Sequence, residues 1–594
     1  MTERLAAAAA RRPWLTIGAW LGTLVLAVAA AMLLLPGRLT TEYEITNNPE
    51  STRAETLLGT HLPHDPHAFD EVVIVQSRRP ASDPAFELFM YRLTRALREA
   101  GGSVVKRETQ LSPDSRALLL PIRLHDVNPV LAVVRRYDDR AGYAVDITGQ
   151  NTLSNDFDAL SQHDLKSGEL KFGMPAALVV LLLVFGAVVA GLVPLVLALV
   201  SITVAVGLTS LFAVPFTLSV FVVNMISGMG LALGIDYSLF VLSRYREERA
   251  RGRSEPDAIA AAGATASRAV LFSGSVFVVA LVGMLLVPNS VLKSLALGAI
   301  LVGMVSVVAA LTLLPALLGL LGDRINALRL PFFGRSIDVV GREGRIWGAI
   351  VRGVMRRPAL WLAVTAVPLL AAAIPILSLK IGHNGVGTVP DRFLAKQGLI
   401  ALERNFPRAN SDPVLIAIDG ASPAVSQDTR RLVARLQHDR EFGPAQTEVR
   451  NGITAVQVPV RGDVEGSAAA AAVRRLRHVY IPESFRRSGV EVLVGGVTAD
   501  DVDYFDTIRN WLPIVFAFVL GLSLVLLTLV FRSVVVATKA IALNLLSVGA
   551  AYGLLVLVFQ KGYLHGFFGF QQVDTIEAWV PLFLFSVLFG LSMD

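Results

Sequence analysis

Long apolar runs dominate the pattern of hydrophobic and polar residues along this chain. A helix needs about 20 consecutive, mostly apolar residues to cross the roughly 30 Å hydrocarbon layer of a bilayer. Ten segments meet that requirement, at residues 14–35, 173–190, 192–213, 217–243, 269–287, 293–321, 359–379, 511–530, 534–558 and 577–594. The pattern therefore predicts a polytopic α-helical membrane protein.

Two polar inserts interrupt the apolar runs, one after the first span and one after the seventh. They cover about residues 37–171 and 380–510. In the first, residue periodicity predicts in turn a strand at Val72–Gln76, a helix at 83–99, a strand at Ala117–Leu124, a helix at 128–138 and a strand at Tyr143–Thr148. In the second it predicts strand Val414–Ile418, helix 425–438, strand Thr454–Val460, helix 466–479 and strand Val490–Val494.

These elements predict the same fold for both inserts. A short strand is expected between the first helix and the next strand, which gives the β-α-β-β-α-β order of ferredoxin-like α+β domains. A polar helical stretch, at 151–171 and at 497–510, closes each insert and leads directly into the next span. The sequence thus predicts two ferredoxin-like domains mounted on membrane helices.

The two halves of the chain repeat each other. The string Phe185–Val189 matches Phe531–Val535 where two spans meet, and Leu231–Asp236 matches Phe589–Asp594 inside a span. The repeat has a length of about 345 residues, and each half contains one span, a polar insert and a block of spans. We therefore predict a two-fold internal repeat.

The first apolar run is predicted to be an uncleaved span. Arg11-Arg12-Pro13 opens it, and Arg356-Arg357-Pro358 opens the seventh span in much the same way. A copy in the middle of the chain cannot be a signal peptide, so both runs are interpreted as membrane helices.

Arginine placement orients the spans. Lys and Arg collect in short cytoplasmic loops, and the stretches Arg244–Arg268 and 322–357 are rich in arginine. With these stretches inside the cell, both polar inserts lie outside. The predicted division is a first transmembrane helix at 1–36, an extracytoplasmic domain at 37–171, helices two to six at 172–321, a cytoplasmic linker at 322–357, helix seven at 358–379, a second extracytoplasmic domain at 380–510 and helices eight to ten at 511–594.

The sequence stops inside the predicted tenth span. Asp594 lies about 15 residues past the interfacial Trp579, which places it roughly 22 Å into a layer of about 30 Å. We therefore expect a transmembrane bundle that is truncated at its C-terminus, without the tail that the repeat predicts by analogy with the residues after Asp236.

Composition narrows the function classes. The 594 residues are 53% apolar and 17% charged, which is more apolar than a soluble core can hide. The net charge of +6 comes mainly from loop arginines that set topology, so we expect no nucleic-acid partner. There is no cysteine, no metal-ligand spacing among the nine histidines and no G-x-x-x-x-G-K-[ST] phosphate loop, so we predict no metal and no cofactor.

Two aspartates inside membrane spans are the candidate functional residues. A charged aspartate at the centre of a membrane helix costs roughly 2.5–3.5 kcal/mol, so its presence indicates a function. Asp236 lies eight residues before Arg244, and Asp594 occupies the matching place in the second half. Two carboxylates that share a dry site cannot easily both ionise, which suits them to exchange a proton.

Neighbouring residues complete the predicted relay. Tyr237 offers a hydroxyl donor next to Asp236, and Gly230 and Gly234 form a G-x-x-x-G face that lets another helix approach closely. Gly590 is the counterpart in the second half. We expect the repeat-related span to be that neighbour. A proton falling through 100 mV releases about 2.3 kcal/mol, more than the roughly 1.4 kcal/mol of a tenfold substrate gradient, so protons are the expected coupling ion of a secondary transporter rather than an enzyme.

Two other charged groups receive structural interpretations. The run Arg246–Arg249 follows the fourth span and is interpreted as a solvated helix end rather than a gating cluster of salt bridges. Glu169 and Lys171, at the mouth of the second span, are interpreted as an interfacial ion pair.

Two strings carry a resemblance to a known family. GMGLALGIDYSLFVLSRYREE (Gly228–Glu248) and IEAWVPLFLFSVLFGLSMD (Ile576–Asp594) resemble the mycobacterial membrane protein large (MMPL) family of the resistance-nodulation-division superfamily. The span order and both inserts extend the resemblance over the whole chain. Members are proton-driven exporters of lipids, glycolipids or drugs in the bacterial inner membrane. Their Asp-Tyr pairs on spans four and ten correspond here to Asp236, Tyr237 and Asp594, and this sequence ends before the second tyrosine.

The resemblance implies that the inserts are porter domains framing a substrate cavity. A membrane lipid or hydrophobic small molecule is the implied substrate, with a homo-oligomer or accessory envelope proteins as further partners. Two alternatives stay open. One is a lipid-sensing or scaffold protein that binds lipid without transport, and the other is a protein-export accessory of the SecD/SecF type.

Overall fold

The computed structural model describes residues 1–41, 44–61, 70–105, 109–140, 142–328, 345–382, 390–406, 413–461, 466–568, 570 and 572–591. Within these residues, nine helices are long and apolar enough to cross a membrane. They are α2 (Pro13–Leu34), the continuous helix Gln150–Phe185, α8 (Val188–Phe212), α9 (Phe221–Ala250), the pair Glu255–Leu285, the pair with a closing turn Ser290–Asn326, α15 with a closing turn (Pro358–Ser378), α20 (Val497–Phe531) and α21 with a closing turn (Val534–Gln560). The continuous helix begins with α6 (Gln150–Asp164) and ends with α7 (Met174–Phe185), and the two pairs are α10 (Glu255–Ala264) with α11 (Ala266–Leu285) and α12 (Ser290–Leu311) with α13 (Leu313–Leu321). They confirm nine predicted spans. The tenth is described as the shorter helix α23 (Trp579–Leu591).

The first insert folds around an antiparallel sheet. Its elements run β2 (Glu71–Ser77), α4 (Pro84–Glu99), β3 (Ser103–Val104), β4 (Gln110–Leu111), β5 (Ala117–Arg123), α5 (Val127–Tyr137) and β6 (Tyr143–Gly149). The strand order is β3-β5-β2-β6, and β4 pairs with β5 outside that path. The apolar faces of α4 and α5 cover one side of the sheet through residues such as Leu93 and Val130. Each predicted helix and strand of this insert lies within one residue of its observed bounds.

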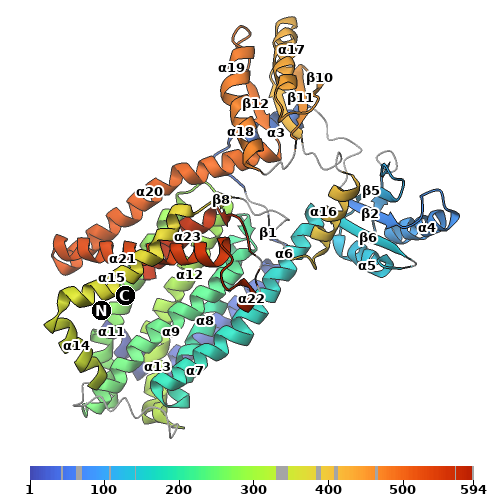
Figure 1. The fold of residues 1–594 in the computed structure, drawn as a ribbon. Helices are drawn as coiled ribbons and strands as arrows, with labels where there is room; N and C mark the ends of the chain where they lie inside the picture. The colour runs from blue at the N-terminus through green and yellow to red at the C-terminus, as the bar shows by residue number, and fades with distance from the viewer. Residues whose placement is uncertain are drawn as a thin grey trace.

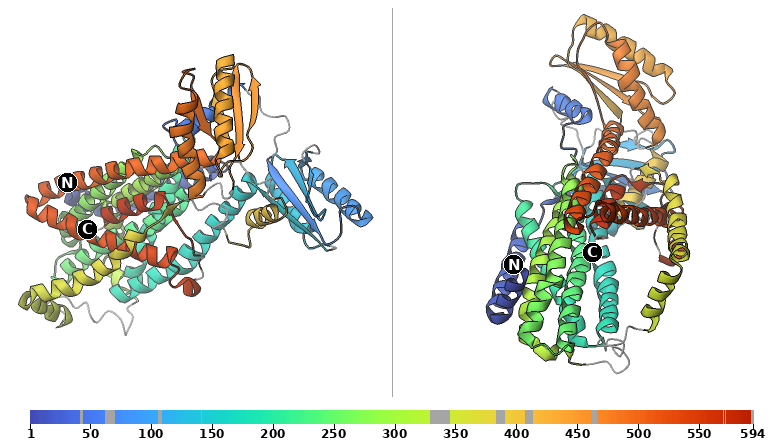
Figure 2. Two further views of the ribbon diagram at one scale, coloured as in Figure 1. Left: turned by 45° about the horizontal axis from the view of Figure 1, so that its top comes forward. Right: turned by 90° about the vertical axis from the view of Figure 1, so that its left-hand side faces the viewer.

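Among the described residues, the second insert has a similar order of elements, with one strand fewer after its first helix and an additional short helix before its last strand. It runs β9 (Pro413–Ile418), α17 (Pro423–His438), β10 (Gln446–Arg450), β11 (Ile453–Pro459), α18 (Ser467–Arg475), α19 (Ile481–Ser484) and β12 (Val492–Gly495). The strand order is β10-β11-β9-β12, again antiparallel throughout. Leu432 of α17 and Val473 of α18 pack on one face of this sheet. Figures 1 and 2 show both sheets projecting from the helical part of the molecule.

The other face of each sheet is covered by a helix from the opposite half of the chain. Helix α16 (Leu394–Asn405) packs on the first sheet, and helix α3 (Glu50–His61) packs on the second. Figure 1 shows α16 beside β2 and α3 beside β12. The buried cluster under α16 consists of Ile74, Ala117, Leu119, Ala401, Leu402 and Phe406. The cluster under α3 consists of Ala54, Leu58, Ala417, Ala455 and Leu493. The two inserts therefore exchange helices, which the sequence pattern did not predict.

A continuous helix joins each insert to the membrane part. The first runs unbroken from Gln150 to Phe185, with a π-helical stretch at Leu165–Gly173, and the second is α20. The predicted boundaries at residues 171 and 510 fall inside these helices, as expected of polar helical stretches that lead into spans. Both helices end in a left-handed residue, Gly186 at φ 63° and Arg532 at φ 51°. Glycine adopts that conformation without steric cost, whereas arginine does so with strain.

Short parallel strand pairs lie between the inserts and the helices. Strand β1 (Leu39–Thr40) pairs with β7 (Leu218–Ser219), and β8 (Ile381–Gly382) pairs with β13 (Ile576–Glu577). In each half, the pair joins the residues after the first helix to the residues that lead into the aspartate-bearing span. The same tie therefore recurs in both halves.

In the described part of the chain, four short α-helices lie outside the predicted spans and inserts. They are α1 (Thr2–Arg11), α10 (Glu255–Ala264), α14 (Arg345–Arg356) and α22 (His565–Phe568). Helix α1 packs along α10 and α13, where Gly263 and Gly319 leave room for its alanines Ala6 and Ala10. The N-terminus is therefore fixed against the end of the bundle that lies opposite the inserts.

Candidate functional site

Helix α9 carries the central aspartate on an exposed face. Asp236 is the only charged residue between Phe221 and Ser243. Along the helix, Gly228, Ala232, Asp236 and Phe240 recur every four residues and are all exposed. The described residues thus leave the Asp236 carboxylate open instead of enclosing it in the predicted dry site. Asp594 lies outside the described residues, so the pairing of the two aspartates stays a prediction.

Tyr237 points to a different neighbour from Asp236. Its side chain is buried, and a Cβ built on Gly274 of α11 would lie 3.5 Å from its hydroxyl oxygen. Successive residues of a helix point about 100° apart, which places the carboxylate and the phenol on different faces. The structure therefore directs the Tyr237 hydroxyl at α11, where the sequence analysis expected it at a carboxylate.

The glycines of the predicted relay do permit close helix packing, but against other helices than expected. A Cβ built on Gly234 would lie 2.6 Å from Ala198 Cα of α8, and Gly230 lies against Ile202 of α8 and against α12. A Cβ on Gly590 of α23 would lie 3.0 Å from a ring carbon of Phe277 on α11. The expectation that the Gly230–Gly234 face meets the span of Asp594 is wrong, because α8 and α12 already occupy that face.

A second carboxylate lies near α9 and was not predicted as a functional group. Glu169 sits in the π-helical stretch before α7, and a Cβ built on Gly228 would lie 3.6 Å from its Oε1. Its Oε2 is buried and has no hydrogen-bond partner among the described residues. Gly228 precedes Asp236 by eight residues, or about 12 Å along the helix. No ion pair joins Glu169 to Lys171 in the described part of the chain, so that interpretation is wrong.

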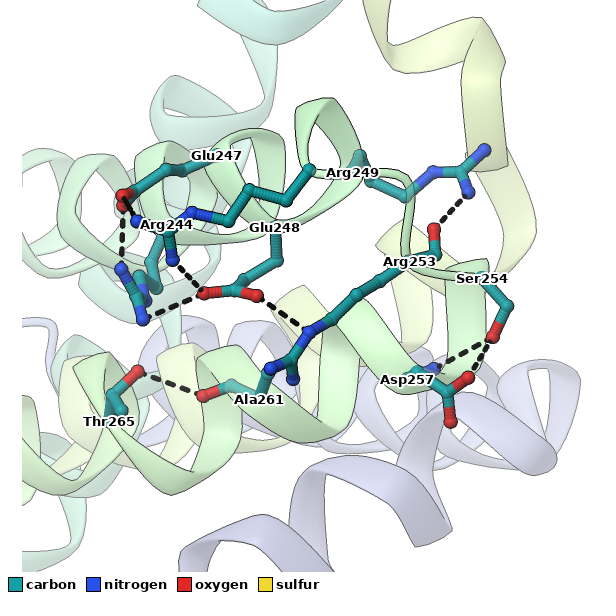
Figure 3. Close-up of polar contacts among 10 residues, drawn as sticks. Arg244, Glu247, Glu248, Arg249, Arg253, Ser254, Asp257, Ala261 and Thr265 are labelled. Atoms are coloured by element: carbon teal, nitrogen blue, oxygen red, sulfur yellow. Dashed lines mark hydrogen bonds and ion pairs between the residues drawn. The ribbon is translucent and has the colours of Figure 1, made fainter. Parts of the chain in front are cut away.

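The charged end of α9 is a buried cluster, not a solvated helix end. Glu248 is 1% exposed and binds three guanidinium groups: Arg244 at 2.7 Å, Arg251 at 2.8 Å and Arg253 at 2.9 Å. Figure 3 shows the arginines converging on this carboxylate between α9 and α10. A buried carboxylate needs such partners because its desolvation is costly. The interpretation of Arg246–Arg249 as solvated is therefore wrong, because α10 folds back over the helix end.

Comparison with known proteins places these features in a family. The model of the MMPL family matches residues 46–361 and 401–594. The mycolic acid-containing lipids exporter MmpL11 of Mycolicibacterium smegmatis is 33% identical over 457 residues, covering 75% of this chain and 47% of that protein. The heme uptake protein MmpL11 of Mycobacterium tuberculosis is 30% identical over 605 residues, covering 98% of this chain and 62% of that protein. This chain thus spans less than two thirds of the length of either relative.

A solved structure shares the fold. The hedgehog release protein Disp from the water bear Hypsibius dujardini superimposes with a TM-score of 0.62 at 13% identity, covering 100% of this chain and 89% of that one. At this identity the similarity shows the arrangement of elements alone. The family match covers most of the chain, and nine helices in its described part are long and apolar enough to span a bilayer. The chain therefore belongs to the MMPL family and is a multi-pass protein of the bacterial cell membrane.

Proposed function

We propose that this protein exports lipids or other hydrophobic compounds across the bacterial inner membrane, driven by the proton-motive force. Membership of the MMPL family and the lipid exporter among its relatives support the substrate class. The proton is the proposed coupling ion, with no other cofactor. In this proposal the protein is a secondary transporter and performs no covalent chemistry on its substrate.

The observation that carries the proposal is the position of Asp236. Its carboxylate lies in the apolar part of a membrane helix, on an exposed face that it shares with Gly228, Ala232 and Phe240. A charge in such a place is costly, so its presence indicates a function. Tyr237, buried against α11, couples the same helix turn to a second span. A proton that binds to Asp236 would thus alter how α9 packs.

We further propose that the inserts are ferredoxin-like porter domains related by a two-fold repeat. The strand orders β3-β5-β2-β6 and β10-β11-β9-β12 support this, because each places the fourth strand beside the first and the second beside the third. The matching left-handed residues Gly186 and Arg532 and the matching parallel strand pairs also support it. In this arrangement, the continuous helices that enter α7 and α20 transmit motion between the membrane part and the porter domains.

Reconstitution into vesicles tests the proposal. The wild-type chain is expected to move a fluorescent lipid when a pH gradient is imposed, and Asp236→Asn is expected to abolish that movement while lipid binding remains. Asp236→Glu is the matched control, because it keeps a titratable carboxyl group at the same turn, and it should retain part of the activity. Equal gradient-driven movement by wild type and Asp236→Asn would reject the relay.

The alternatives make different predictions in the same vesicles. The Mycobacterium tuberculosis relative is described as a heme uptake protein, so an importer would move its hydrophobic ligand in the opposite direction. A lipid sensor or scaffold would bind lipid without gradient-driven movement in either direction. An accessory of protein export would move no lipid and would respond to a translocating polypeptide instead.

A further inference from the structure

A cavity of about 920 Å³ opens at the end of α9 that lies opposite the inserts. Its walls come from the end of α7, the last turns of α9, the start of α11 and the turn after α13. They consist of Val184, Phe185, Phe240, Ser243, Arg244, Arg246, Glu247, Arg249, Ala250, Gly252, Arg253, Thr265, Ala266, Asp323 and Asn326. The volume lies within the range of small-molecule sites. Asp236 is not part of its lining, so the cavity is separate from the proposed relay.

The cavity walls combine two kinds of surface. On the membrane side lie the apolar side chains of Val184 and Phe240, and Phe240 is 55% exposed. On the other side lie arginines that begin at Arg244, the first charged residue after Asp236. The boundary between the apolar span and the charged end of α9 therefore crosses the cavity. Such a boundary is where the acyl chains and the headgroup of a membrane lipid meet.

Positive charge exceeds negative charge in the lining. Four arginines line the cavity, against the two carboxylates of Glu247 and Asp323. The arginines are held in place by the protein itself. Arg244 binds Glu247 and Glu248, Arg249 binds Asp323, and Arg246 donates to the carbonyl oxygen of Phe185. A preorganised set of guanidinium groups binds phosphate well, because each one presents several donors in a rigid fork.

Three buried polar atoms in this wall have no hydrogen-bond partner among the described residues. They are Nε of Arg244 and Nε of Arg249, both donors, and Oδ1 of Asn326, an acceptor. A buried polar group without a partner costs about 1–3 kcal/mol. A ligand with both phosphate oxygens and a hydroxyl or ammonium group can satisfy donors and acceptor alike.

We propose that this cavity binds the phosphate-bearing headgroup of an anionic membrane lipid from the inner leaflet. The phosphate lies among Arg244, Arg246 and Arg249, and the acyl chains leave over Phe240 into the bilayer. Basic pockets between membrane helices on the cytoplasmic side are known to bind anionic headgroups. The lipid would join α7, α9, α11 and the turn after α13 at one point, so its binding stabilises the folded bundle.

Ser243 provides the sharpest test, because it lines the cavity, is exposed and forms none of the ion pairs described above. Ser243→Glu places a carboxylate in the cavity without removing an arginine partner, and Ser243→Gln is the neutral control of the same size. Arg251→Gln is a second control. It removes ion pairs with Glu247 and Glu248 at 2.5 and 2.8 Å, but Arg251 does not line the cavity.

Thermal unfolding of the full chain in neutral detergent is followed against added short-chain phosphatidylglycerol, short-chain phosphatidylcholine or inorganic phosphate. Phosphatidylglycerol is expected to raise the unfolding temperature of wild type, Ser243→Gln and Arg251→Gln over the same concentration range. Ser243→Glu should need at least about tenfold more lipid for the same rise, equivalent to about 1.4 kcal/mol of binding free energy. If Ser243→Glu does not fold, Arg249→Gln replaces it, with the same expected weakening.

Three results would overturn the proposal. The first is that the variants do not separate as expected. This is the case if phosphatidylglycerol raises the unfolding temperature of Ser243→Glu as readily as that of Ser243→Gln, or if Arg251→Gln loses as much of this rise as Ser243→Glu does. The second is an equal rise with phosphatidylcholine, which would mean that acyl packing alone stabilises the chain. The third is a full rise with inorganic phosphate alone, which would assign the cavity to a soluble anion.

Discussion

The membrane helices of the two halves differ in how far the protein itself buries them. Among the helices that the repeat relates, the apolar stretch of α8 is 56% buried and that of α21 is 28% buried, whereas α2 and α15 are 6% and 0% buried and the helices that end in α7 and α20 are 12% and 22% buried. The first half also contains the apolar stretches of α9 and α12, which are 56% and 78% buried. Yet α20 is the most apolar of the nine candidate spans that the structure describes. Hydropathy therefore identifies helices suited to a bilayer, whereas small residues and buried polar groups decide which of them pack together.

The largest effect is expected where the first half buries a charge cluster. Glu248→Gln removes the carboxylate that holds Arg244, Arg251 and Arg253. We expect it to lower the free energy of unfolding by about 3 kcal/mol. This is the low end of the cost of breaking a buried ion pair, because the arginines reach water. Unfolding in mixed micelles measures this. Asp506→Asn is the control in the second half, since its ion pair with Arg474 is exposed. An equal loss in both variants would contradict the comparison.

The next effect concerns helix packing. Gly234→Ala forces a methyl group against the backbone of α8 at Ala198, so we expect a loss of about 1–3 kcal/mol in the free energy of unfolding. Gly521→Ala in α20 meets nothing within 4 Å and should be neutral or slightly stabilising. Thermal unfolding of the two variants in the same detergent checks this. If Gly521→Ala were the more damaging change, the second half would be the better packed one.

A smaller effect is expected in the second half, where a buried hydrogen bond joins two helices. The Tyr552 hydroxyl of α21 donates to the carbonyl oxygen of Pro581 in α23. Tyr552→Phe removes that hydrogen bond and should cost about 1 kcal/mol. Limited proteolysis at the α21–α23 connection should then become faster, with no change at the α8–α9 connection. Faster cleavage in both halves would show that they unfold as one unit.

The smallest effect extends the comparison to the inserts. Burial raises the pKa of the Glu71 carboxyl, and hydrogen bonds from Thr152 and Asn151 offset this only in part. The folded protein thus binds this proton more tightly than the unfolded chain does. The stability that results is complete below the ordinary glutamate pKa and is lost as pH rises through the raised value.

Pro413 in the second insert occupies the position that Glu71 occupies in the first. Each is the first residue of its strand and lies against the glycine at the end of its insert. The part of the pH dependence that comes from this strand-end carboxyl should therefore arise in the first insert alone. Glu71→Gln should reduce the decline in melting temperature between the ordinary and the raised pKa, as scanning fluorimetry across that range can measure. An unchanged pH profile in Glu71→Gln would assign the decline to another group.

Periodicity predicted the elements of both inserts closely, because each strand and helix has one apolar face toward a core built largely from its own insert. It could not predict the positions of α3 and α16, whose partners lie on the opposite half of the chain. The same limit applies to the site. The sequence identified Asp236 and the glycines around it, but the neighbours of Gly234 and Tyr237 depend on how α8 and α11 cross α9. Glu248 was misinterpreted because α10 buries it, and nothing local records that.

The helix exchange between the inserts has a consequence for the order of assembly during synthesis. The ribosome completes β2, β5 and β6 long before it reaches α16, so one face of the first sheet, including Ile74 and Leu119, must wait for Leu402. Meanwhile α3 has left the ribosome before the strands it covers exist. Neither domain can reach its final form co-translationally as an independent unit, so a mutation that delays the second insert should expose the first to aggregation and proteolysis.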